Sequence, residues 1–195
     1  LTACTATNQA TSTSEKSQSD TTSGEAVQSG QEEKAAKALD TSKPEGMLEV
    51  HYIDVGQGDA EFLRTESGCI LIDAGTTDSR HDLVAYLEKY TEKIDYMILT
   101  HPHEDHIGGA SEVIESLEVV NLIMPDAAAF SRLLDSVEKK GVDAHIAAPG
   151  DTYSVGDLQI EILSPLDESY ENTNDYSAVV HARFGGVTFL FTGDA

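Results

Sequence analysis

The stretch that most constrains this chain is residues 100–109, THPHEDHIGG, which follows an apolar run and ends in two glycines. It places four potential metal ligands, His101, His103, Asp105 and His106, within six residues. Imidazole and carboxylate are ligands that borderline divalent cations such as Zn²⁺ accept, and the absence of cysteine from the stretch disfavours a closed structural site. The stretch therefore predicts an open metal site of the catalytic kind.

The spacing of these residues suggests how they share metal. His101 and His103 are two positions apart, so in an extended segment both rings project to the same side and can bind one ion. Asp105 and His106 then turn toward a neighbouring position that suits a second ion. The alternatives are a surface loop that happens to be rich in histidine, and a loop that binds metal without catalysis.

The pattern His101-x-His103-x-Asp105-His106 resembles the signature of the metallo-β-lactamase superfamily of binuclear metallohydrolases. Three further blocks, HYIDVGQGDA at 51–60, LIDAG at 71–75 and FTGD at 191–194, look like its ComEC-like branch, which includes the hydrolase domain of a DNA-uptake competence protein. The match runs in order from about residue 47 to the end. It implies an α/β fold, the αββα sandwich, in which helices pack outside two facing sheets.

The resemblance also implies roles for residues outside the loop. Asp194 matches the carboxylate that bridges two metals in many relatives, and Asp73 matches the aspartate beneath the metal loop that orients a histidine. Asp59 is expected to line the pocket. Where many relatives supply another histidine, this chain has Asn174 and Ser177, in a motif of the kind that ComEC-like relatives commonly have.

The metals implied are two divalent ions, Zn²⁺ or alternatively Mn²⁺. His101 and His103 would hold the first, Asp105 and His106 the second, and Asp194 would bridge them. For Asp59 and Asp194 the alternative is an ordinary turn aspartate. The remaining histidines, His51, His81, His145 and His181, are predicted to be structural or solvated.

The chain changes character near residue 46. Residues 1–46 are rich in Ser, Thr, Gln, Ala, Lys and Glu and have too little apolar surface to offset chain entropy, which predicts a disordered tether before a hydrolase domain at 47–195. The start, Leu-Thr-Ala-Cys4, resembles a bacterial lipobox, so we expect lipid on Cys4 and an extracytoplasmic protein anchored to the cell membrane. The alternative is a chance run of small residues. Cys69, in an apolar run, is predicted to be a buried packing residue.

The net charge is −23, from 12 basic and 35 acidic residues. Removing the four basic and seven acidic residues of 1–46 leaves eight against 28, so residues 47–195 carry −20. No basic cluster is present, which argues against a long nucleic-acid track. A phosphodiester substrate is still compatible with this charge, because bound cations change the local field.

Periodicity and turn residues predict strands near 48–55, 60–64, 69–73, 94–100, 119–124, 143–147, 151–155, 158–163, 178–184 and 187–192, with helices over 80–90, 110–117 and 127–140. Residues 165–175 are predicted to be a loop. Because Ala195 directly follows Asp194, we expect that the last strands and helices of the sandwich, with a late histidine ligand, lie beyond this chain.

The favoured function is hydrolysis of a phosphodiester outside the cell, nuclease-like, with Asp105 taking or orienting the proton of the attacking water. Nucleic acid is one candidate substrate, and no protein partner is predicted. The alternatives are a phosphorylcholine-esterase-like or other ester hydrolase of the envelope, and a surface protein that binds metal without catalysis.

Overall fold

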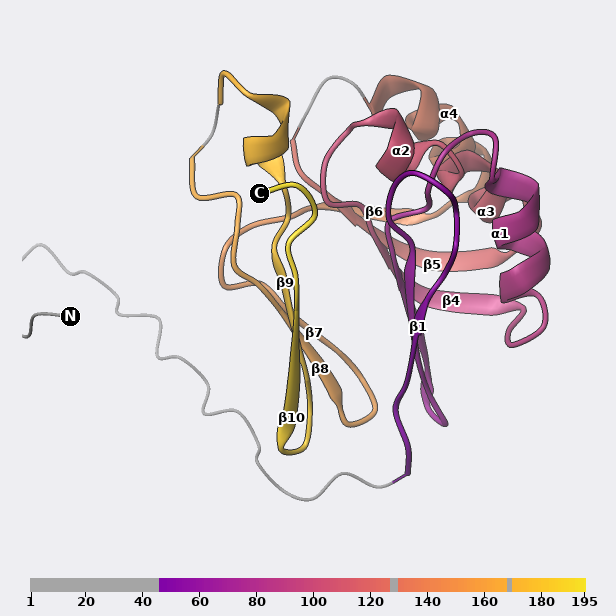
Figure 1. Ribbon diagram of the computed structural model, residues 1–195, viewed down its shortest axis with the longest axis vertical. Coiled ribbons are helices and arrows are strands. Elements are labelled where there is room, and N and C mark those ends of the chain that lie inside the picture. Colours follow the sequence, from indigo (N-terminus) through magenta and orange to yellow (C-terminus); the bar gives the residue numbers. More distant parts are fainter. Residues whose placement is uncertain (1–45, 127–129, 168–169) are drawn as a thin grey trace, which may run out of the picture. The chain divides into compact units, whose positions relative to one another are not determined.

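Two β-sheets face each other in the computed structural model of the chain, which describes residues 46–126, 130–167 and 170–195 (Figure 1). Except for Gly46, the predicted tether lies outside these residues, and so does the predicted lipidation site Cys4. No helix in the described ranges is long and apolar enough to cross a membrane.

The first sheet has six strands in sequence order: β1 (Glu49–Tyr52), β2 (Glu61–Thr65), β3 (Gly68–Ile72), β4 (Lys93–Ile98), β5 (Glu118–Met124) and β6 (Asp143–Ile146). The pairs β1–β2 and β2–β3 are antiparallel, whereas β3 through β6 run parallel. The parallel strands are joined by helical crossovers, as parallel pairing requires. Their carboxyl ends therefore meet at one edge of the sheet.

The second sheet is an antiparallel meander of four strands: β7 (Thr152–Val155), β8 (Leu158–Ile162), β9 (Val180–Phe184) and β10 (Val187–Phe191). A 3₁₀ turn, η2 (Thr173–Tyr176), precedes β9. It lies at the same end of the molecule as α2 and the carboxyl terminus (Figure 1).

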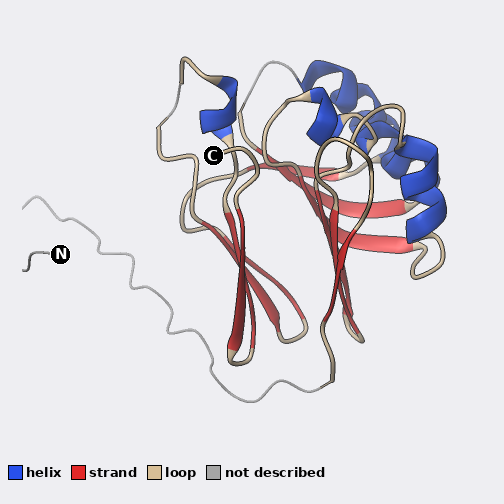
Figure 2. Ribbon diagram, in the orientation of Figure 1, coloured by secondary structure: helices blue, strands red, loops and turns tan. Residues whose placement is uncertain are grey.

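Four α-helices complete the described fold: α1 (Arg80–Leu87), α2 (Glu104–Ile107), α3 (Ala110–Ser116) and α4 (Ser131–Lys140). The helices α1, α3 and α4 cover the outer face of the six-stranded sheet (Figure 2). The short helix α2 lies at the edge where β4 ends. Gly141, with a left-handed φ of 69°, directly follows α4, which ends at Lys140 as predicted.

Alternating side chains of the first sheet build two cores. In β3, Cys69 and Leu71 pack toward the helices, whereas Ile70 and Ile72 face the second sheet. A strand buried on both faces explains the nearly continuous apolar sequence of this segment. Cys69 is only 2 % exposed, which confirms its predicted packing role.

The predicted α/β sandwich is confirmed, with local differences. In the described ranges no helix packs on the outer face of the four-stranded sheet, so the second helical layer is not seen there (Figure 2). Residues 173–175, part of the predicted loop at 165–175, belong to the η2 turn, which Asn172 caps by accepting a hydrogen bond from the backbone N–H of Asn174; residues 168–169 lie outside the described residues. Residues 127–129, the predicted start of the last helix, lie outside the described residues, and α4 is seen from Ser131.

Candidate metal centre

The site forms where the parallel strands β3 and β4 end. Asp73 follows β3, and Thr100 and His101 follow β4 by two and three residues. The backbone N–H of Asp73 donates to the carbonyl of Ile98, which ties the two strand ends together. Adjacent parallel strands thus bring polar residues to one edge, where α/β folds gather their ligands.

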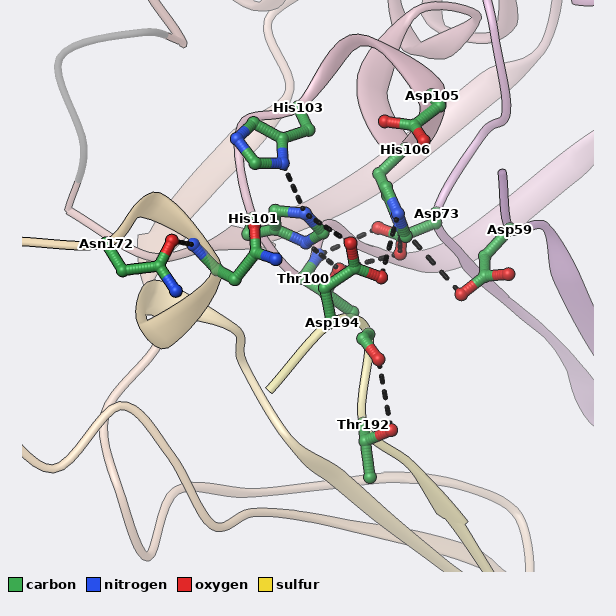
Figure 3. Close-up of polar contacts among 12 residues, drawn as sticks. Asp59, Asp73, Thr100, His101, His103, Asp105, His106, Asn172, Thr192 and Asp194 are labelled. Atoms are coloured by element: carbon green, nitrogen blue, oxygen red, sulfur yellow. Dashed lines mark hydrogen bonds and ion pairs between the residues drawn. The ribbon is translucent and has the colours of Figure 1, made fainter. Parts of the chain in front are cut away.

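Three groups converge at this edge: His101, His106 and Asp194 (Figure 3). Nε2 of His106 lies 3.4 Å from Oδ1 of Asp194, and Nε2 of His101 lies 3.8 Å from Oδ2 of the same carboxylate. One ligand atom from each lies within 4.8 Å of the other two. Both imidazoles are buried, whereas the Asp194 side chain is 42 % exposed, so the cluster opens toward solvent.

Asp73 lies beneath these histidines and holds the loop. Its Oδ1 accepts from the backbone N–H of Thr100 at 2.8 Å, and its Oδ2 accepts from the Thr100 hydroxyl at 2.7 Å. The same Oδ2 lies 2.7 Å from Nδ1 of His106. Asp73 itself has a φ of 55°, a left-handed conformation that is uncommon outside glycine. The orienting role predicted for this residue agrees with this geometry.

His103 and Asp105 lie next to this cluster. Nδ1 of His103 is 3.1 Å from Nε2 of His101, and the two rings meet edge to face, so they lie on the same side of the segment as their spacing predicts. The Asp105 carboxylate accepts from Nε2 of Gln57 at 3.4 Å. Neither side chain belongs to the His101, His106 and Asp194 group as placed, so their roles as ligands stay predictions.

Asp59 is close to the site from the other side. Its Oδ2 lies 4.0 Å from Nδ1 of His106, and Asp59, Asp73 and His106 form a second group that could hold a cation. Since Asp73 already bonds Nδ1 of His106, this group is better explained as support for the imidazole.

Ser177 and Asn174 contribute oxygens without partners. Ser177 is fully buried, and neither its Oγ nor Oδ1 of Asn174 has a hydrogen-bond partner among the described residues. A buried polar atom without a partner is costly, which suggests a ligand or water there. These orphaned oxygens, together with a donor set of nitrogen and carboxylate oxygen, fit a divalent cation at this edge.

The protonation of the two buried histidines differs. Burial, with the neighbouring His106, lowers the pKa of His101 to about 4, which keeps its imidazole neutral and able to bind metal. Burial alone would lower the pKa of His106 as well, but the Asp73 and Asp194 carboxylates outweigh it and raise this pKa to about 9 in the metal-free protein.

The Gly-Gln-Gly-Asp loop packs directly on the metal loop. The backbone N–H of Asp59 donates to the carbonyl of Asp105 at 3.3 Å, and a Cβ on Gly58, whose φ is 103°, would overlap that carbonyl oxygen. Only glycine fits this close approach without strain. The loop therefore packs against α2 and helps to position it, a contact that the sequence did not predict, since Asp59 was expected only to line the pocket.

Two residues at the site were not predicted. Thr100 joins Asp73 to His101, since its Oγ1 is 3.0 Å from Nδ1 of His101. Glu61 lines a cavity of about 160 Å³ with Asp59 and Asp73. Burial chiefly, then the charges of those two aspartates, raises its pKa to about 8. The sequence signal for Glu61 was an acidic residue next to the apolar Phe62 and Leu63 in a predicted strand, two positions after Asp59.

The other histidines lie away from the cluster and make local contacts. His81 pairs with Glu112, His145 with Asp143 and His181 with Glu161, and each of these side chains is at least 28 % exposed. His51 bonds the hydroxyl of Tyr86. Their predicted structural or solvated roles are consistent with these positions.

Comparison with known proteins agrees with the site. The family model of the metallo-β-lactamase superfamily matches residues 53–195. The chain is 30 % identical over 169 residues to ComE operon protein 3 of Bacillus subtilis, covering 75 % of this chain and 22 % of that protein. It is 29 % identical over 159 residues to Recombination protein 2 of Haemophilus influenzae, covering 79 % and 19 %.

A solved metallo-β-lactamase of Cronobacter sakazakii with a HARLDQ motif (mutant S60) has the same fold, with a TM-score of 0.54 and 20 % identity over 73 % of this chain and 58 % of that one. The chain belongs to the metallo-β-lactamase superfamily of hydrolases, and its relatives place it on the ComEC-like branch. It spans about a fifth of the length of the two curated relatives.

Proposed function

We propose that this domain is a metal-dependent phosphodiesterase. The observation that supports this most directly is the cluster of His101, His106 and Asp194, whose ligand atoms lie within 4.8 Å of one another at an open edge of the sandwich. Two divalent ions, Zn²⁺ or Mn²⁺, would be held there, His101 and His103 on one side, Asp105 and His106 on the other, and Asp194 between them. When bound, such ions act as Lewis acids toward a phosphoryl oxygen and lower the pKa of water.

The chain's own residues supply positioning and a proton acceptor. Asp73 fixes the rings of His106 and His101, directly and through Thr100, so that each presents Nε2 toward Asp194. Burial of Asp105 would raise its pKa, but its hydrogen bonds and the neighbouring histidines give a net lowering, so this carboxylate is ionised at neutral pH. It can therefore accept or orient the proton of the attacking water, a general-base role.

The charge of the domain bears on the substrate. With a net charge of −20 over residues 47–195, a long polyanion gains little from general electrostatic attraction. A phosphodiester substrate would then bind mainly at the metal centre, through its reacting phosphate and the substrate groups next to that phosphate. The name Recombination protein 2 for one relative favours a nucleic acid among phosphodiesters, and the acidic charge argues against a long nucleic-acid track.

The proposed location follows from the lipobox-like start. We propose a lipid on Cys4 that anchors the protein to the bacterial membrane outside the cytoplasm, with substrate met at the envelope. Mass spectrometry of the protein from bacterial membranes tests this, because a diacylglycerol adduct is expected on wild type and not on Cys4→Ser.

Activity is tested with the full chain loaded with Zn²⁺ or Mn²⁺. Bis-p-nitrophenyl phosphate, single-stranded and duplex DNA, a phosphorylcholine ester and a β-lactam are compared. Metal-dependent turnover of phosphodiesters is expected in wild type and in the control His81→Ala, whose exposed ring lies away from the site, but not in His106→Ala. No turnover of any phosphodiester by metal-loaded wild type overturns the proposal, and turnover of the ester alone supports the ester-hydrolase alternative.

A further inference from the structure

Thr100 is fixed at the point where the metal loop meets both sheets. Its backbone N–H donates to Oδ1 of Asp73, and its carbonyl accepts from the N–H of Ala178, which precedes β9, each at 2.8 Å. Its side chain is packed under Gly193, where a Cβ would lie 2.6 Å from Oγ1. Thr100 is 1 % exposed, so its hydroxyl contacts protein groups and not bulk solvent.

The hydrogen bonds of this hydroxyl have one consistent direction. The Asp73 carboxylate can only accept, so the single hydroxyl proton of Thr100 goes to Oδ2 of Asp73 at 2.7 Å. The hydroxyl oxygen is then the acceptor for His101, whose Nδ1 lies 3.0 Å away. His101 must therefore carry its proton on Nδ1, which leaves the Nε2 lone pair facing Asp194 and His103.

His106 is oriented by the same carboxylate without an intermediary. Its Nδ1 lies 2.7 Å from Oδ2 of Asp73, which directs its Nε2 toward Asp194 as well. We propose that Thr100 is a positioning residue that links Asp73 to His101 by hydrogen bonds. One buried carboxylate then orients both His106 and His101, and the Nε2 atoms of both rings point to the same cation site. This inference rests on the metal binding in the proposed function, but not on the identity of the substrate.

Two substitutions separate the hydroxyl from the shape of the side chain. Thr100→Val keeps the volume and the contact under Gly193 but has no hydroxyl. Thr100→Ser keeps the hydroxyl and loses one methyl group. If Thr100 only packs, the valine variant resembles wild type and the serine variant is the poorer one. If the hydroxyl matters, the order is reversed.

The first measurement uses the metal-free full chain with ¹⁵N-labelled histidine. Long-range ¹H–¹⁵N spectra report which ring nitrogen carries the proton. Wild type and Thr100→Ser are expected to show His101 protonated on Nδ1, with His101→Gln assigning its signals. Thr100→Val is expected to shift His101 toward the Nε2–H form, because the acceptor for Nδ1–H is gone.

The second measurement is the affinity for Zn²⁺, by competition with a chromogenic chelator. Loss of an outer hydrogen-bond partner of a metal-binding histidine weakens binding about 10–100-fold, so this drop is expected for Thr100→Val and reversed in Thr100→Ser. An unchanged His101 tautomer and an unchanged Zn²⁺ affinity in Thr100→Val overturn the proposal. If the valine variant does not fold, Thr100→Ala, which removes the hydroxyl without adding bulk, decides by the same two criteria. Neither readout requires turnover, so failure of the phosphodiesterase proposal remains a separate result.

Discussion

Oδ2 of Asp73 lies 2.7 Å from Nδ1 of His106, and the two residues are 1 % and 2 % exposed. A buried carboxylate is stable only when its oxygens are bonded, and here the His106 ring and the two donors of Thr100 bond them. The pair therefore contributes to the fold of the site before any cation binds.

Replacing Asp73 tests this contribution. Asp73→Asn is expected to lower the free energy of unfolding by about 1–3 kcal/mol, because an amide NH₂ then faces the Thr100 hydroxyl and Nδ1 of His106, which both donate to the carboxylate in wild type. Asparagine tolerates the left-handed backbone at φ 55°, whereas alanine does not, so Asp73→Ala is expected to lose more. Urea unfolding of the metal-free proteins measures both, and an Asp73→Asn variant as stable as wild type would contradict the assigned network.

Glu61 gives the metal-free protein a specific pH dependence. Its pKa in the folded state, about 8, is above the unfolded value of 4.5, so the folded state binds this proton more tightly. The associated stability is fully present below pH 4.5 and is lost as pH rises through about 8. Glu61→Gln removes the ionisation, so the variant is expected to gain stability relative to wild type over this range.

Urea unfolding at several pH values measures this difference, with Glu118→Gln as the control, since Glu118 is exposed at the start of β5. Parallel stability curves for wild type and Glu61→Gln between pH 4.5 and 8 would show that Glu61 ionises normally in the fold.

Gly58 and Gly56 form a matched pair for the loop above the metal site. Both have a positive φ, 103° and 80°, but a Cβ on Gly58 overlaps the carbonyl of Asp105, whereas a Cβ on Gly56 meets nothing within 4 Å. Gly56→Ala is expected to lower the free energy of unfolding only through the strain of placing alanine at a positive φ. Gly58→Ala should cost about 1–3 kcal/mol more, because the two loops must separate. Equal losses in urea unfolding would mean that the loops do not touch.

Metal binding should stabilise the fold through the cluster. A ligand at 100 times its dissociation constant adds about 2.7 kcal/mol to the free energy of unfolding. Zn²⁺ is therefore expected to raise the melting temperature of wild type and of the control His181→Ala, whose ring pairs with Glu161 on the second sheet. His101→Ala and Asp194→Asn should lose most of this increase. The same increase in all four proteins would place the ion elsewhere.

The parts of the candidate site that could be predicted from the sequence are those that a local residue pattern determines. The 101–106 loop and Asp194 have diagnostic neighbours, and the pleat of an extended segment is enough to bring His101 and His103 to one side. The strands were located to within a few residues, because apolar runs and glycine turns mark them. The short helix α2 was missed, since four residues carry no periodic signal.

Contacts between segments that are distant in the chain could not be predicted from the sequence. The hydroxyl of Thr100 acquires its role from Asp73, 27 residues earlier, and no local pattern distinguishes it from any other threonine after a strand. The environment of Glu61 likewise depends on the register that pairs it with Ile72. The orphaned Oγ of Ser177 appears only once the second sheet is docked.

The backbone hydrogen bond from Ala178 to Thr100 joins the two sheets, and it bears on the order in which the parts of the site fold. Asp73, His101 and His106 are synthesised within one parallel segment of the first sheet, but Asp194 joins them only after β9 and β10 have paired and docked. Such distant pairing is slow relative to local structure. We therefore expect a newly made chain to pass through a stage at which its histidines are grouped but Asp194 has not yet joined them, and we expect tight metal binding only when folding is complete.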